Sequence, residues 1–176
     1  MKRSAAAAFA LLASVPAGAQ VAGVDTETPC PDGMFEAPES FDRKQVAYCF
    51  LVRLNDDDDP TDAYGLLAAD GALIEPDSLP YGGRFVGATE LNERFVPAFF
   101  GAWERAVSRP QAIFEGPDGV VIDILFDVKS RRTGEEGQLR LMERYVMRNG
   151  RIAEIWPYYF DTVRAREMIS GADVER

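Results

Sequence analysis

The stretch LRLMERYVMRNGRIAEIWPYYF, residues 139–160, decides the fold of this chain because it predicts a β-hairpin. Polar and apolar residues alternate with the two-residue period of strands on both sides of Asn149-Gly150, a dipeptide typical of a tight type I′ turn. With this turn, Glu143 is predicted to lie opposite Trp156. The same face then carries an apolar and aromatic set: Leu139, Leu141, Tyr145, Met147, Ile152, Tyr158 and Phe160.

A carboxylate on such an aromatic face indicates a pocket. Burying a charge without a partner is costly and raises the pKa of a carboxyl group, so a bound polar ligand or a proton-transfer reaction would account for it. We therefore predict Glu143 as a catalytic residue, with Tyr145, Trp156 and Tyr158 as ligand contacts. Two alternatives stay open: a strand-end glutamate near solvent, and a glutamate paired with an arginine.

The N-terminus has the pattern of a secretory signal over residues 1–19. Lys2-Arg3 is followed by an apolar run over residues 5–15 and a small-residue cleavage site at residues 17–19. No later segment approaches the roughly 20 apolar residues of a membrane span. We therefore expect a periplasmic or secreted protein without a membrane span.

The remaining residues are enough for one domain with a real core. We predict an irregular N-terminal arm over residues 20–39, rich in Pro, Gly, Thr and acidic residues, the domain itself over residues 40–170, and a frayed tail over residues 171–176.

Cysteine and histidine counts narrow the chemistry. The only cysteines are Cys30 and Cys49, and in an exported protein we expect a disulfide between them; the alternative is one buried and one exposed thiol. The chain has no histidine, which excludes serine-histidine and cysteine-histidine mechanisms and leaves Asp or Glu as the expected general base. We expect no metal site and no cofactor. The net charge of −10 disfavours a nucleic-acid partner.

The order of the predicted elements is helices first and strands last, which is an α+β pattern. Apolar spacing predicts three helices ahead of the last four strands: one from Ser40, as its cap, to Asn55, one from Pro60 to about Asp70, and one over residues 88–106 that Pro97 kinks or divides. Period-two alternation predicts these strands: 72–75, 111–115, 120–129, 139–148 and 151–160. Asp161-Thr162 is predicted to cap a short C-terminal helix. The result is a curved sheet around the helices with an open mouth, where pockets form preferentially.

Three further features have two interpretations each. The acidic run Asp56–Asp59 lacks the spacing of a calcium loop, so we interpret it as a solvated turn in which Asp59 caps the second helix. Tyr81, beside Gly82-Gly83, is either at the rim of a cavity or exposed in its loop. Trp103 lies off the apolar stripe of its helix and is a candidate ligand contact, although core packing is the commoner role of such a ring.

Three stretches, taken in order, resemble the SnoaL-like branch of the nuclear transport factor 2 (NTF2) superfamily. They are LLAADGALIE at residues 66–75, PYGGRFVG at residues 80–87 and ERYVMRNGRIAE at residues 143–154. The resemblance covers residues 41–168 and implies an NTF2-like cone: N-terminal helices packed on a strongly curved, mostly antiparallel sheet around a central cavity. It also implies a homodimer through the outer face of the sheet.

The resemblance suggests two further site residues. Polyketide cyclases of this family use an acidic residue near the end of the last strand as a base, and Asp161 is similar in position; a helix cap is the alternative role. These cyclases also carry a histidine before a threonine-glycine pair, where this chain has Arg132-Thr133-Gly134. Arginine cannot take a proton, so we expect Arg132 to stabilise an enolate or to hold a carboxylate ligand.

Together these features predict acid/base catalysis, of isomerase or cyclase type, on a small hydrophobic carbonyl compound. Glu143 or Asp161 is the base, and a tyrosine, Tyr81, Tyr145 or Tyr158, donates a hydrogen bond to the developing oxyanion. The alternative is a non-catalytic protein of the cell envelope that binds a small hydrophobic molecule in the same cavity. An interaction module that uses the outer face of the sheet ranks third.

Overall fold

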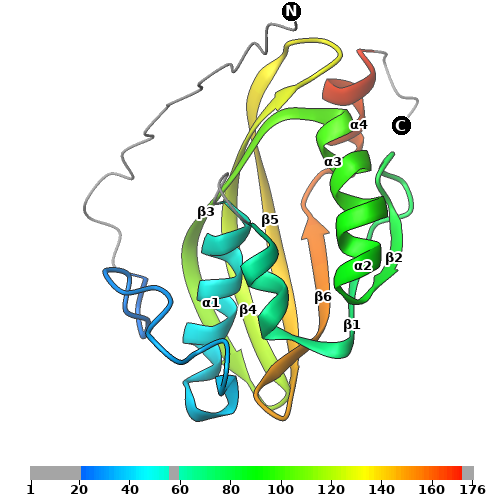
Figure 1. Ribbon diagram of the computed structural model, residues 1–176. Helices are drawn as coiled ribbons and strands as arrows, with labels where there is room; N and C mark the ends of the chain where they lie inside the picture. Colours follow the sequence, from blue (N-terminus) through cyan, green and yellow to red (C-terminus); the bar gives the residue numbers. More distant parts are fainter. Residues whose placement is uncertain (1–20, 56–59, 172–176) are drawn as a thin grey trace, which may run out of the picture.

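The protein is an α+β fold built on one six-stranded curved sheet, seen here in a computed structural model that describes residues 21–55 and 60–171 (Figure 1). The strand order is β2-β1-β6-β5-β4-β3, and every neighbouring pair is antiparallel except β1 and β6. The strands are β1 (Leu67–Glu75), β2 (Gly83–Val86), β3 (Trp103–Gly116), β4 (Gly119–Ser130), β5 (Glu136–Arg148) and β6 (Arg151–Tyr159). The predicted fold class is confirmed.

Short helices cover the concave face of this sheet, with α1 over one half and α2 and α3 over the other (Figure 1). The helical segments are η1 (Pro38–Ser40), α1 (Arg43–Leu54), η2 (Pro60–Leu66), α2 (Gly87–Glu90), η3 (Leu91–Phe95), α3 (Val96–Ala102) and α4 (Thr162–Ser170). None of the helices in the described part of the chain is long and apolar enough to cross a membrane.

The first helix begins later than the sequence predicts. Asp42, not Ser40, is the N-cap of α1, and its carboxylate accepts a hydrogen bond from the backbone N–H of Lys44 at 2.8 Å. Of the apolar residues at helical spacing in this segment, Val46, Cys49 and Phe50 are buried, whereas Leu54 at the end of α1 is exposed. Cys49 forms a disulfide with Cys30, as predicted, so the N-terminal arm is held covalently against α1.

The second predicted helix is mostly wrong. A 3-10 turn, η2, ends at Leu66, and residues 67–70 already belong to β1. Leu67 pairs with Ile152 of β6, and an irregularity follows at Gly71, where an added Cβ would lie 2.9 Å from the Ile152 carbonyl oxygen. Parallel pairing with β6 therefore outweighs the helical spacing of this segment. The acidic run Asp56–Asp59 lies outside the described residues.

The third predicted helix is divided and shorter than expected. A π-helical segment, η3, joins α2 to α3, and Pro97 lies in the first turn of α3, directly after this segment. The helix ends at Ala102 because Trp103 pairs with Ser130 and starts β3. Trp103 is consequently a strand residue.

The hairpin forms with the predicted turn but a different register. Asn149 (φ 52°) and Gly150 (φ 74°) both have positive φ, as a type I′ turn requires. A β-bulge at Ala153 then shifts the pairing by one residue, so Glu143 lies opposite Pro157 and the predicted pairing with Trp156 is wrong. The bulge brings Ile155 rather than Glu154 to the buried face, so the carboxylate of Glu154 is not added to that face.

Beyond the bulge every side chain of β6 is on the opposite face from the predicted one. Tyr159 points towards the helices, whereas Trp156, Tyr158 and Phe160 lie on the outer face. Tyr158 is 51% exposed and Phe160 is 67% exposed. The chain then enters α4, whose N-cap is Asp161, as predicted.

Candidate functional site

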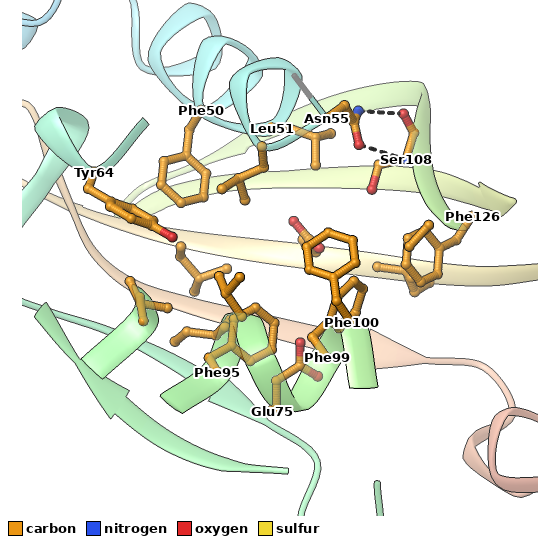
Figure 2. Close-up of a pocket in the computed structure, with 18 of the residues that line it drawn as sticks. Phe50, Leu51, Asn55, Tyr64, Glu75, Phe95, Phe99, Phe100, Ser108 and Phe126 are labelled. Atoms are coloured by element: carbon orange, nitrogen blue, oxygen red, sulfur yellow. Dashed lines mark hydrogen bonds between the residues drawn. The ribbon is translucent and has the colours of Figure 1, made fainter. Parts of the chain in front are cut away.

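A pocket of about 200 Å³ lies between the helices and the concave face of the sheet (Figure 2). Its wall is largely apolar, with aliphatic side chains and aromatic rings from α1, η2, η3, α3, β4 and β6; the rings are Phe50, Tyr64, Phe95, Phe99, Phe100, Phe126 and Tyr159. Two of the lining residues, Phe100 and Leu54, are also exposed to solvent. Asn55 and Ser108 close one side, joined by two hydrogen bonds of 3.0 and 3.1 Å.

Two carboxyl groups interrupt this apolar wall, and the first is Glu143 of β5. Every second residue of β5 points to the concave face, so Glu143 lies on that face between Leu141 and Tyr145, whose side chains are buried. The Tyr145 hydroxyl donates a short hydrogen bond to Oε2 of Glu143. Burial raises the pKa of Glu143 to about 7, and the hydrogen bond from Tyr145 opposes that rise. The Glu143 residue as a whole is half-buried, and it lines the pocket.

The second carboxyl group belongs to Glu75, the last residue of β1. Its side chain is 5% exposed, and its Oε2 atom has no hydrogen-bond partner among the described residues. Burial, and then the nearby charge of Glu143, raise its pKa well above the usual range. Figure 2 shows the Glu75 carboxyl group beside Phe99, directed towards the other lining residues.

A chain of hydroxyl groups supports the pocket beside these carboxyls. Tyr159 of β6 lines the pocket, and its hydroxyl lies 3.2 Å from the hydroxyl of Tyr81. The indole Nε1–H of Trp103 donates to Tyr81 Oη at 3.2 Å. Because Trp103 only donates, Tyr81 is free to donate to Tyr159, which leaves the Tyr159 proton for the pocket. Burial raises the pKa of both tyrosines, so both stay protonated at neutral pH.

The structure brings together four of the eight predicted catalytic and ligand-binding residues. Glu143 lines the pocket, and Tyr145, which is not in the lining, donates a hydrogen bond to the Glu143 carboxyl group. Tyr81 is hydrogen-bonded to Tyr159, and Trp103 is hydrogen-bonded to Tyr81. Both Tyr81 and Trp103 are buried, so the exposed-loop alternative for Tyr81 is wrong.

The other four lie elsewhere. Trp156 and Tyr158 lie on the outer face because of the bulge at Ala153, which corrects their predicted position beside Glu143. Arg132 is exposed in the β4–β5 turn, outside the lining of the pocket. Asp161 also lies outside the lining, and its Oδ1 accepts from the Arg164 N–H at 2.8 Å as the cap of α4.

Sequence reasoning missed two pocket residues, Glu75 and Tyr159. For Glu75 a signal existed, because Leu73 and Glu75 are two residues apart in a short predicted strand and therefore share one face. For Tyr159 the signal depends on the bulge at Ala153, which the regular alternation of the segment conceals. In the described part of the chain, no group of three His, Cys, Asp or Glu residues is arranged to hold a metal ion.

Known proteins similar to this chain were found by family model and by structure. The family model of the SnoaL-like domain matches residues 50–155. No curated protein matches the chain. Among solved structures, TerC co-crystallised with polyporic acid superimposes with a TM-score of 0.65 at 21% identity, over 75% of this chain and 98% of that one.

Two further solved structures have the same fold. An NTF2-like protein of Burkholderia thailandensis E264 has a TM-score of 0.63 at 18% identity, over 75% of this chain and 97% of its own. A protein with a ketosteroid isomerase-like fold from Catenulispora acidiphila DSM 44928, in complex with trimethylamine, has a TM-score of 0.59 at 12% identity, over 70% and 91%. At these identities the likeness concerns the fold.

Proposed function

Because this chain belongs to the SnoaL-like domain family and has the NTF2-like fold, we propose that it catalyses proton transfer on a small hydrophobic carbonyl compound. The observation that carries the proposal is Glu143, a carboxyl group with a pKa of about 7 in a pocket otherwise lined mainly by rings and aliphatic side chains. A general base works best when its pKa is close to the working pH. The missing histidine leaves this role to a carboxylate.

The proposed reaction starts from ionised Glu143. Its carboxylate removes a proton from the carbon next to the substrate carbonyl group, and the electron pair of the broken C–H bond moves to the carbonyl oxygen as an enolate. Tyr159 donates a hydrogen bond to this oxygen, supported by Tyr81 and Trp103. If the substrate carries a β,γ C=C bond, the enolate is conjugated with it, and returning the proton from Glu143 to the γ-carbon moves the double bond next to the carbonyl group and regenerates the carbonyl, so the isomerisation needs no external reagent.

The decisive test is turnover by Glu143→Gln. Glutamine keeps the shape of the side chain but cannot accept the proton, so activity on a carbonyl compound that the unmodified protein turns over should fall by roughly a hundredfold or more. Glu154→Gln is the matched control, since Glu154 lies outside the pocket and accepts a hydrogen bond from Trp156 Nε1 at 2.9 Å. Full activity in Glu143→Gln would refute the assignment.

A second candidate is a non-catalytic binding protein. The extent of the aromatic wall favours it, because such a pocket retains an apolar molecule without any reaction. Two structural neighbours were crystallised with small molecules, polyporic acid and trimethylamine. Native mass spectrometry separates the two functions: a binder should co-purify with an unchanged molecule, whereas an enzyme should convert added substrate.

Export and dimerisation complete the proposal. The signal-like residues 1–19 and the Cys30–Cys49 disulfide support a periplasmic or secreted protein. The exposed rings of Tyr158 and Phe160 on the outer face of the sheet support a homodimer through that face. Light scattering of the purified protein measures its mass directly, and a monomeric mass would remove the dimer from the proposal.

A further inference from the structure

The unpartnered oxygen of Glu75 points to a particular class of ligand. Glu75 is one of the residues that line the pocket, and its Oε2 is buried and accepts no hydrogen bond from any described residue. A buried acceptor without a donor costs about 1 to 3 kcal/mol. Glu143 differs in this respect, because Tyr145 supplies it with a donor. The protein therefore satisfies one of its two pocket carboxyls and leaves the other for an incoming group.

The charge of the pocket favours a cationic group over a neutral one. Both carboxyls are acidic groups in one small space, and no lysine or arginine occurs among the described residues that line it. The titratable groups that interact with Glu75 are Glu143 from β5, Tyr159 from β6 and Tyr81 from the β1–β2 loop, and each is neutral or negative. A ligand cation would supply the missing charge and the missing donor together.

The aromatic wall suits a cation as well. Phe99 lies near Glu75 in Figure 2, and its ring centroid is 5.3 Å from that of Phe95 and 5.1 Å from that of Tyr81. Ring faces attract an ammonium group, and this attraction strengthens when the group is shielded from water. The net charge of −10 also favours the approach of cations from solution.

The size of the pocket limits the ligand. A cavity of about 150 Å³ is sufficient for benzene in another protein, so the volume of about 200 Å³ here accommodates one ring with a short substituent. We propose that the pocket recognises a small hydrophobic amine, whose protonated nitrogen donates a hydrogen bond to Oε2 of Glu75 while its apolar body packs against the rings. The inference deepens the proposed function, on which it rests for the use of this pocket: the substrate carries an amine besides its carbonyl group.

Binding of a cation would require Glu75 to ionise. Burial, and then the charge of Glu143, raise the pKa of Glu75 well above its usual range and so favour its protonated form, which means that an ammonium ligand bound to the carboxylate should displace a proton. The amine itself stays protonated through this range. Its affinity should therefore rise with pH. A neutral ligand that accepts a hydrogen bond from protonated Glu75 would show the opposite trend.

The test compares benzylamine with benzyl alcohol, which has the same ring and a neutral polar group. Isothermal titration calorimetry from about pH 6 to pH 8, in two buffers with different ionisation enthalpies, measures both affinity and proton release. Benzylamine should bind roughly tenfold or more tightly than benzyl alcohol, release protons and bind more tightly as pH rises. Equal affinities, an affinity that falls with pH, or no binding of either probe would overturn the inference.

Variants assign the effect to Glu75. Glu75→Gln should lose the preference for benzylamine and its proton release, whereas the Glu154→Gln control should keep both. If Glu75→Gln does not fold, the pH dependence of benzylamine affinity and the comparison with benzyl alcohol in the unmodified protein still show whether the pocket recognises an amine. Amine binding without any turnover would contradict only the proposed reaction, and turnover without an amine preference would contradict only this inference.

Discussion

Replacing Glu143 with glutamine should change how the stability of the protein depends on pH. Glu143 has a pKa of about 7 in the folded state against an ordinary value of 4.5. Below pH 4.5 it is protonated in both the folded and the unfolded state. Between the two values the unfolded state releases the proton and the folded state keeps it, so the free energy of unfolding falls as pH rises. Above about pH 7 both states are ionised and the loss is complete.

The magnitude follows from the two pKa values. At about 1.4 kcal/mol per pKa unit, their difference corresponds to about 3 kcal/mol, of which about 2 to 3 kcal/mol falls between pH 5 and pH 8. Glutamine is neutral at every pH, fills nearly the same volume and still accepts a hydrogen bond from Tyr145. The stability of Glu143→Gln relative to the unmodified protein should therefore increase by about 2 to 3 kcal/mol from pH 5 to pH 8.

Urea unfolding at the two pH values measures this difference, because most other titrating groups cancel between the variant and the unmodified protein. Glu154→Gln is again the matched control and should show no comparable change. A difference that stays constant with pH would mean that Glu143 is solvated like an ordinary surface carboxylate. One of the opposite sign would mean that an unrecognised partner stabilises its charge. Either result would refute the reasoning from burial.

Three other predictions test the surroundings of the site. Tyr145→Phe removes the donor that opposes the effect of burial, so NMR titration should find the pKa of Glu143 above its value in the unmodified protein; an unchanged pKa would disprove the hydrogen bond. Cys30→Ser with Cys49→Ser opens a loop between residues 19 positions apart, so unfolding free energy should fall by about 3 kcal/mol, and an equally stable variant would show that the bridge has little effect. Asp161→Ala removes the cap of α4, so the free energy of unfolding measured in urea should fall by about 1 kcal/mol while turnover is retained. Loss of turnover in a folded variant would show instead that Asp161 takes part in catalysis.

Local patterns in the sequence were sufficient for much of the fold. The type I′ turn at Asn149-Gly150, the buried stripe of α1 and the cap at Asp161 each depend on a few neighbouring residues, so they are visible without coordinates. The disulfide followed from a count of two cysteines in a chain expected to be exported. Glu143 was identified because the two-residue period of the strands places this carboxylate on the same face as several apolar and aromatic residues.

What the sequence by itself determined is thus the hairpin, most of the other strands, the first and last helices and one acidic residue on an apolar face. The tertiary structure alone decided which other groups that residue meets. The bulge at Ala153 turns Tyr159 inward and Trp156 outward, and pairing with β6 makes residues 67–70 a strand that ends at Glu75 inside the pocket. The physical reason is that strand register depends on hydrogen bonds and burial summed across neighbouring strands, and a shift of one residue reverses every side chain beyond it.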